Sequence, residues 1–282
     1  VNNSSDPRHG TVASAEYNAG AGGIISMWPS ALGLAATFDP LIVKKFGNIT
    51  AIEYRGLGII TALSPQVDLA TDPRWNRVSG TFGEGPKLAA DMTRAYIDGL
   101  QTSIVSKEIG GGWGYYSVNA IVKHWPGGGN SEAGRDPHYG FGKYGVYPGN
   151  NFLQHLIPFT EGAFKLEGKT KMTSGLMPSY AIAYHPGIKN DEKTGNNYNP
   201  YMVTDLLRNK YKYEGVVCTE WNITADETSV HQFISGKPWG VEKLSVAQRH
   251  YKALMAGVDQ FGGNNDAAPL IEAYNIGVKE FG

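Results

Sequence analysis

The chain has 282 residues, of which 41% are hydrophobic, and this is enough apolar material for one large α/β domain or two small ones. Its 25 basic and 26 acidic side chains give a net charge of −1, which argues against a nucleic acid or another polyanion as a partner. No apolar stretch approaches the ~20 residues that a membrane span needs, so we expect no membrane partner. The single cysteine, Cys218, excludes a disulfide within the chain.

The sequence of the first half of the chain predicts alternating helices and strands. After Asp39-Pro40, which suit a cap and a first helical residue, apolar side chains recur at helical spacing, and Gly56 and Gly58 bracket the end. A second helix begins at Lys87, with its apolar residues on one face. The strands of this half are expected over 59–63 and 118–122, and the second one ends in Lys123-His124.

The second half continues this alternation. Helices are expected over 151–166, 201–211, 246–254 and 269–279, and strands over 172–177, 216–219 and 258–261. Long polar loops separate several of these elements, among them 68–86 and 125–149.

Strands that alternate with helices favour a parallel sheet with crossover helices. Each predicted strand ends in polar residues and a loop, which is typical of the functional face of a (β/α)8 TIM-type barrel. A complete barrel takes about 250 residues without insertions, and the long loops leave room here for only five or six strands, so we expect an incomplete barrel. A doubly wound open sheet is the alternative, but no Gly-x-Gly-x-x-Gly follows a strand, so a dinucleotide site is not expected.

The stretch from Gly215 to Trp221 places a carboxylate at the end of a buried strand. Three apolar residues run into Cys218, Thr219 and Glu220, and the indole of Trp221 follows. In a parallel barrel, a polar residue at the carboxyl end of a strand faces the active site. A carboxylate beside a flat aromatic face suits a sugar-cleaving site. A lone strand-end acid also commonly caps the next segment, so these residues alone leave both roles open.

Lys123 and His124 join two polar side chains to a glycine loop at the end of another strand. Adjacent strand residues point to opposite faces, so the two can share a ligand only if the strand kinks there. A salt-bridged lysine and a hydrogen-bonded histidine in the barrel wall are an equally good interpretation. The loop lacks the pattern of a phosphate-binding Walker motif.

Two further groups are candidates for binding or catalysis. Arg74, Trp75 and Arg77 lie in one polar loop and suit hydroxyl or carboxylate recognition, or a surface salt bridge. Asp136 and His138 have the spacing of a catalytic dyad in which an aspartate orients a histidine, although such pairs are common by chance. No set of His, Cys, Asp and Glu has zinc-ligand spacing and no Gly-x-Ser-x-Gly occurs, so we predict no metal and no cofactor.

Many short motifs in a fixed order resemble those of one enzyme family. They are Asp6-Pro7-Arg8-His9-Gly10, Gly33 to Pro40, Ser64 to Arg77, Thr81-Phe82-Gly83-Glu84, Lys123-His124-Trp125-Pro126-Gly127, Gly134-Arg135-Asp136, Met177-x-x-Tyr180, Thr204 to Arg208 and Cys218-Thr219-Glu220-Trp221. Together they resemble glycoside hydrolase family 3, the retaining exo-glycosidases of the β-glucosidase and β-xylosidase type. The likeness covers essentially the whole chain.

The resemblance implies a role for each matched position. Asp6, Arg77, Lys123 and His124 would hold the hydroxyls of the non-reducing-end sugar, with Met177 also at the substrate; Tyr180 would hydrogen-bond the nucleophile; and Trp221 would line the next subsite. Glu220 would be the nucleophile. The substrate implied is a β-linked oligosaccharide or glycoside.

One departure from the family bears on catalysis. The family nucleophile is an aspartate followed by tryptophan, whereas this chain has Glu220. The extra methylene moves the carboxylate by about 1.5 Å, and an error near 1 Å can cost ~10²-fold in rate. We therefore expect a slow enzyme.

The resemblance also implies how the chain relates to a larger protein. We expect residues 1–282 to be a single glycosidase barrel domain, and a fragment, because the general acid of β-glucosidase-type members usually comes from a second domain. That domain is expected beyond residue 282, or on a partner chain. A periplasmic or secreted location is favoured over a cytoplasmic one.

Two other functions remain open from the sequence. A β-N-acetylhexosaminidase of the same family would use an Asp136/His138 dyad as its acid and base, although the loop spacing and Trp221 favour the glucosidase type. A non-catalytic carbohydrate-binding protein would follow if the glutamate at position 220 had abolished catalysis.

Overall fold

The computed structural model describes residues 26–103, 109–184, 192–233 and 235–281. Asp6, the predicted sugar ligand nearest the start of the chain, lies outside these residues. The chain divides into two compact units. The first unit comprises Val1–Thr71, Arg77–Gly127 and Leu153–Leu176, and the second comprises Asp72–Asn76, Gly128–Phe152 and Met177–Gly282.

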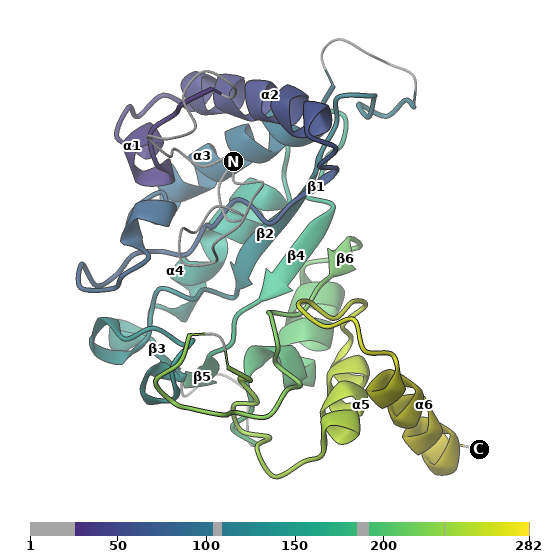
Figure 1. Ribbon diagram of the computed structural model, residues 1–282. Coiled ribbons are helices and arrows are strands. Elements are labelled where there is room, and N and C mark those ends of the chain that lie inside the picture. Colours follow the sequence, from purple (N-terminus) through teal and green to yellow (C-terminus); the bar gives the residue numbers. More distant parts are fainter. Residues whose placement is uncertain (1–25, 104–108, 185–191, 234, 282) are drawn as a thin grey trace. The chain divides into compact units, whose positions relative to one another are not determined.

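Figure 1 labels the helices and strands of both units. The helices are α1 (Ala31–Ala35), α2 (Pro40–Gly56), α3 (Pro86–Gln101), α4 (Phe152–Ile157), α5 (Val246–Ala256) and α6 (Ala268–Phe281), with wider π-type turns at Pro158–Ala163 and Tyr201–Lys210. The strands are β1 (Thr61–Ala62), β2 (Asn119–Trp125), β3 (Tyr144–Val146), β4 (Gly175–Pro178), β5 (Ile182–Tyr184) and β6 (Val216–Val217). Short 3₁₀ turns occur at Val78–Gly80, Glu132–Gly134, Gly140–Gly142, Pro148–Asn150 and Asn196–Tyr198.

A parallel sheet forms the centre of the first unit. β1 pairs with β2 in parallel, with Thr61 opposite Asn119, and the first half of β4 lies on the other side of β2. All but the first residue of β2 are buried. The ring of Trp125, at the end of β2, packs edge-on against Phe159 with ring centroids 5.3 Å apart. β2 is therefore the apolar core strand of this unit.

Helices α2 and α3 lie side by side in the first unit (Figure 1). The Asp39 side chain accepts a hydrogen bond from the Leu41 backbone at 2.8 Å and Pro40 opens the helix, so the predicted start of α2 is confirmed. The two helices touch through glycines. A methyl group on Gly47 would lie 2.6 Å from the Tyr96 carbonyl, and one on Gly99 would lie 2.4 Å from the Lys44 carbonyl.

The predicted helix over 151–166 is shorter and less regular than expected. α4 ends at Ile157, and the π-type turns of Pro158–Ala163 continue it. Proline has no backbone N–H to give to the preceding turn, and the backbone widens at this point, as it does in π-bulges. This wider segment packs on α3, and the Arg94 side chain donates to the carbonyls of Glu161 and Lys165.

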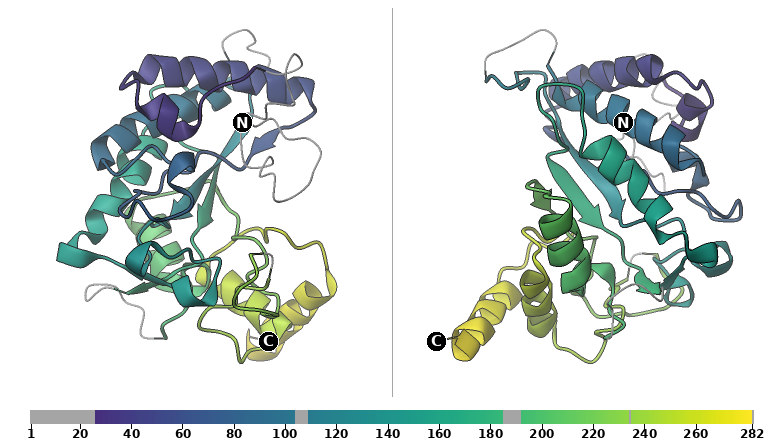
Figure 2. Two further views of the ribbon diagram at one scale, coloured as in Figure 1. Left: turned by 60° about the vertical axis from the view of Figure 1, so that its left-hand side comes forward. Right: turned by 180° about the vertical axis from the view of Figure 1, so that it is seen from behind.

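The second unit contains β6, the end of β4, a small sheet and two packed helices. β3 and β5 pair in parallel, with Tyr144 opposite Ile182. α5 begins with a capping box, in which the Ser245 and Gln248 side chains and backbones bond each other. α6 lies beside α5 (Figure 2), and the Tyr251 hydroxyl donates to Glu280 at 2.6 Å.

Several sequence predictions about the elements were wrong. The strand expected over 258–261 is reduced to a single bridge between Cys218 and Gln260. The reason is that the Val217 N–H donates to the Asp259 side chain, whereas in a regular strand pair it would donate to a backbone carbonyl. The strand expected over 172–177 begins only at Gly175, since the Thr173 hydroxyl bonds the Ala120 carbonyl instead. Helix α1 and strands β3 and β5 were not predicted.

The α/β class with parallel strands is confirmed. Among the described residues, no strand pairing closes the strands into a ring. In the same part of the chain, none of the helices has the length and apolar character needed to cross a membrane.

Candidate active site

The segment after β1 runs alongside the end of β2 in the first unit. The Lys123 backbone N–H donates to the Pro65 carbonyl and the Lys123 carbonyl accepts from Val67, at 3.1 and 2.8 Å. This parallel pairing places Asp68 next to His124. Lys123 and His124 are both buried, as an interior strand end requires.

Asp68 holds His124 by its backbone and by its ring. The His124 backbone N–H donates to Asp68 Oδ1 at 3.0 Å, and the imidazole Nδ1 lies 2.7 Å from Asp68 Oδ2. Gln66 Nε2 also donates to Oδ2, at 3.0 Å. Burial would raise the pKa of the Asp68 carboxyl, but the charge and hydrogen bonds of His124, with the Arg77 charge, lower it overall. Asp68 is therefore an ionised acceptor at neutral pH.

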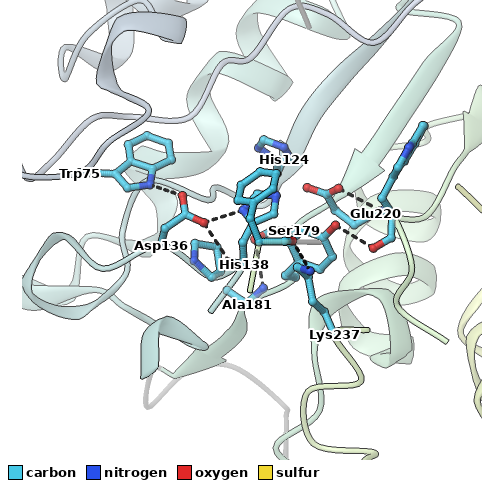
Figure 3. A network of polar contacts seen from close by, with 12 residues as sticks. Trp75, His124, Asp136, His138, Ser179, Ala181, Glu220 and Lys237 are labelled. Atoms are coloured by element: carbon cyan, nitrogen blue, oxygen red, sulfur yellow. Dashed lines mark hydrogen bonds and ion pairs between the residues drawn. The ribbon is translucent and has the colours of Figure 1, made fainter. Parts of the chain in front are cut away.

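Glu220 lies at the predicted strand end of the second unit. The Thr219 N–H donates to the Gln260 carbonyl at 2.8 Å, which extends the pairing of β6 as far as Glu220. The Glu220 N–H donates to Asn197 Oδ1 at 3.1 Å. The Glu220 carboxylate (Figure 3) accepts from the Trp221 N–H, also at 3.1 Å. The side chain is 5% exposed. A carboxylate held this way has a fixed position at the end of the strand.

Trp221 packs its indole on a glycine pair. A methyl group on Gly262 would lie 2.4 Å from the ring, and one on Gly263 would lie 2.7 Å from it. The indole remains 36% exposed. The Tyr180 hydroxyl donates to the Trp221 carbonyl at 2.7 Å. The expected bond from Tyr180 to the nucleophile stays a prediction, while the observed bond fixes the backbone directly after Glu220.

Asp136 and His138 form the contact that their spacing suggested. His138 Nδ1 lies 2.5 Å from Asp136 Oδ1, and the other carboxylate oxygen accepts from the Trp75 indole at 2.8 Å (Figure 3). Phe233 stacks on the histidine ring with centroids 4.2 Å apart, and Tyr180 meets it edge-on at 4.7 Å. Asp136 thus anchors an aromatic cluster in which Phe233 is half-buried.

Lys237 is a buried cation that the sequence did not single out. Its Nζ donates to the carbonyls of Phe233 and Ser235, at 2.7 and 2.5 Å, and lies 5.6 Å from the centre of the Tyr180 ring. Burial lowers the pKa of Lys237 to about 8, against the charges of Glu220, Asp136 and Glu227, which raise it. The lysine is therefore still mainly protonated at neutral pH and acts electrostatically on Glu220.

Cys218, next to Thr219 in the same strand end, is buried and chemically quiet. Burial, with the Glu220 charge, raises the pKa of its thiol to about 12. The thiolate, which is the nucleophilic form, is thus scarce at neutral pH.

The predicted site residues fall into two groups. Arg77, Lys123 and His124 belong to the first unit, and Met177, Tyr180, Glu220 and Trp221 belong to the second. Met177 is buried within β4. The roles that the resemblance implies for both groups at one sugar stay a prediction.

Two further charged residues, one in each unit, had no role assigned from the sequence. Asp68 lies within the motif from Ser64 to Arg77. Its approach to His124 depends on a pairing between segments that are 56 residues apart in the sequence. No sequence feature indicated that Lys237 is buried, because a lysine in a polar loop is usually exposed. Among the described residues, no cluster of three or more His, Cys, Asp or Glu side chains could hold a metal ion.

A sequence model of the glycosyl hydrolase family 3 N terminal domain matches residues 8–272. The chain belongs to this family. Its α/β fold is thus of the family's TIM-type barrel class, as predicted.

Two curated relatives are similar to this chain over most of its length. It is 43% identical over 266 residues to a periplasmic β-glucosidase/β-xylosidase of Dickeya chrysanthemi, a match covering 90% of the chain and 39% of the relative. It is 41% identical over 277 residues to β-glucosidase C of Emericella nidulans, covering 97% of the chain and 42% of the relative. The chain therefore spans about two fifths of the length of these curated relatives.

Solved structures of the family share the fold. A β-glucosidase from Erythrobacter marinus superposes with a TM-score of 0.66 at 26% identity, covering 89% of this chain and 29% of that one.

Proposed function

We propose that this chain supplies the nucleophile and the sugar-binding side of a retaining exo-β-glycosidase that acts on β-glucosides or β-xylosides. The observation that carries the proposal is the position of Glu220. It is a buried carboxylate at a strand end, held by the Trp221 N–H and within the field of the Lys237 ammonium. The names of the Dickeya and Emericella relatives support the substrate class.

The proposed chemistry uses Glu220 in two steps. Its carboxylate attacks the anomeric carbon of the terminal sugar while the bond to the leaving oxygen breaks, and a general acid gives that oxygen a proton. The resulting glycosyl ester on Glu220 is then hydrolysed by water. The acid has to lie about 5 to 5.5 Å from the nucleophile in such enzymes, and we propose that a second domain or partner chain provides it.

Each group, taken by itself, offers side chains suited to a sugar. Lys123, His124 and Arg77 offer donors and acceptors suited to ring hydroxyls. The exposed face of Trp221 offers an apolar surface for the C–H side of the next sugar. Asp6, which precedes the described residues, is proposed to join the hydroxyl-binding group.

Trapping the covalent intermediate tests this function. An activated 2-deoxy-2-fluoro-β-glucoside with a good leaving group needs little help from a general acid and forms a long-lived ester. We expect mass spectrometry to find one fluoroglucosyl group per chain, on the peptide that contains Glu220. Glu220→Gln should abolish labelling, and Glu214→Gln, which changes an exposed glutamate, should leave it intact. Labelling of another carboxylate would contradict the proposal.

A second candidate function is β-N-acetylhexosaminidase activity, which the short contact between Asp136 and His138 favours. The Phe233 ring that covers His138 counts against it, since a general acid has to reach the leaving oxygen. Assays on aryl β-glucoside, β-xyloside and N-acetyl-β-glucosaminide separate the two enzymes. Sugar binding without release from any of the three would identify a non-catalytic carbohydrate-binding protein.

We also propose a periplasmic or secreted location, which the name of the Dickeya relative supports. Fractionation of the source cells with an antibody to this chain tests it. Recovery with cytoplasmic markers alone would contradict it.

A further inference from the structure

Asp68 is a carboxylate to which the proposed reaction gives no part, yet both of its oxygens face His124. The backbone N–H of His124 donates to one oxygen at 3.0 Å, and the ring Nδ1 lies 2.7 Å from the other. The exposed fractions of the two residues are 1% and 3%. Such a two-point contact fixes the ring plane as well as its position.

The contact also decides which ring nitrogen carries a proton. An ionised carboxylate can only accept hydrogen bonds, so Nδ1 has to be the donor. In a neutral imidazole with a proton on Nδ1, Nε2 is an acceptor. The observed geometry therefore makes Nδ1 the donor to Asp68, and Nε2 is an acceptor when the ring is neutral.

The carboxylate is itself held in place. Gln66 Nε2 donates to Asp68 Oδ2 at 3.0 Å, and the bridge between Gln66 and Lys123 ties this segment to β2. Arg77 and His155 also act electrostatically on Asp68 within the same unit. A rotation of Asp68 away from His124 would have to break these bonds.

We propose that Asp68 is a positioning residue that keeps the His124 imidazole protonated on Nδ1, so that Nε2 accepts a hydrogen bond from a hydroxyl of the bound sugar. This inference rests on the proposed function, because it assigns His124 to the sugar. It predicts a preference for substrates whose hydroxyl at that position is free, over deoxy or methylated analogues.

The first test reads the proton position directly, without sugar or activity. The full chain is labelled with nitrogen-labelled histidine, the His124 signals are assigned with His124→Gln, and the ring nitrogens are observed by NMR at mildly alkaline pH. We expect a protonated Nδ1 and an unprotonated Nε2. Asp68→Asn, which removes the charge at nearly constant shape, should give a mixture of both tautomers. A proton on Nε2 in the unmodified chain would overturn the proposal.

The matched control is Asp98→Asn. Asp98 is a buried carboxylate of the same unit that accepts from the backbone N–H groups of Glu167 and Gly168. Its loss should affect stability and leave the His124 signals where they were. If Asp68→Asn does not fold, the tautomer of the unmodified chain still decides the question.

The second test adds methyl β-glucoside and its monodeoxy analogues. We expect the His124 Nε2 signal to shift with the parent sugar, and one analogue to bind more weakly by at least about tenfold. Asp68→Asn should lose most of this discrimination. Equal discrimination in both proteins, or no response of Nε2 to any sugar, would overturn the role of Asp68. Failure of the fluoroglucoside to label Glu220 would instead count against the proposed hydrolase alone.

Discussion

Glu220 differs by one methylene from the aspartate that the family resemblance implies. We expect Glu220→Asp to raise the rate at which the fluoroglucosyl-enzyme forms, by up to roughly 10²-fold, because the shorter side chain restores the distance to the anomeric carbon. The measurement is labelling kinetics by mass spectrometry in the protein that also contains the acid. Glu214→Asp, at an exposed glutamate, serves as the control. A slower rate in Glu220→Asp would show that the glutamate is the adapted nucleophile.

Lys237 should influence Glu220 through its charge. A nearby cation favours the ionised carboxylate, so its removal in Lys237→Met should move the acidic side of the labelling pH profile to higher pH. Lys143→Met removes a half-buried lysine that pairs with Glu242 at 3.2 Å, and should leave the profile unchanged. Identical profiles for the unmodified protein and Lys237→Met would exclude an electrostatic role.

His155 should make stability depend on pH. Burial lowers its pKa to about 4, whereas the unfolded chain has the ordinary value of about 6.5. The unfolded state then binds more protons between these values, so stability is fully present above about pH 6.5 and falls as the pH drops toward 4, by about 3 kcal/mol in all. Urea unfolding across this window should show a smaller loss in His155→Gln. An equal loss would contradict the prediction.

At the scale of elements, the crossing of α2 and α3 depends on glycine. A methyl group on Gly99 would lie 2.4 Å from the Lys44 carbonyl and 2.8 Å from the Gly47 α-carbon, so Gly99→Ala forces the helices apart. We expect a loss of about 1 to 3 kcal/mol in the free energy of unfolding.

Gly56→Ala provides the control for this prediction within α2. A methyl group there would meet nothing within 4 Å, so we expect no loss and a gain of up to about 1 kcal/mol from helix propensity. Both variants can be compared by urea denaturation. Similar effects from the two alanines would mean that the helix contact does not limit stability.

At the scale of the whole molecule, binding of the correct sugar should stabilise the folded chain. A ligand at 100 times its Kd adds about 2.7 kcal/mol, because it binds only the native state. Thermal unfolding should therefore shift upward with glucose or xylose, and less with N-acetylglucosamine. Glucitol at equal concentration controls for solvent effects. A larger shift with N-acetylglucosamine would favour the alternative hexosaminidase.

The sequence by itself determined the features that local signals encode. Asp39-Pro40 marks the start of α2 because a cap and a proline act on their immediate neighbours. The apolar run before Lys123 identifies β2, because a buried parallel strand needs apolar side chains on both faces. The run before Glu220 marks β6, in which Val217 is buried and Val216 is exposed. The ordered motifs then identified glycosyl hydrolase family 3.

Only the tertiary structure decided which groups act on one another. Asp68 orients His124 because the segment after β1 pairs with β2, and no local pattern specifies that register. Lys237 has a lowered pKa because the folded chain buries its ammonium, and desolvation is a property of the surroundings. The strand expected at 258–261 does not form for a similar reason, since the Asp259 side chain accepts the hydrogen bond of the Val217 N–H. Contacts between distant segments set these outcomes, and a sequence pattern records only near neighbours.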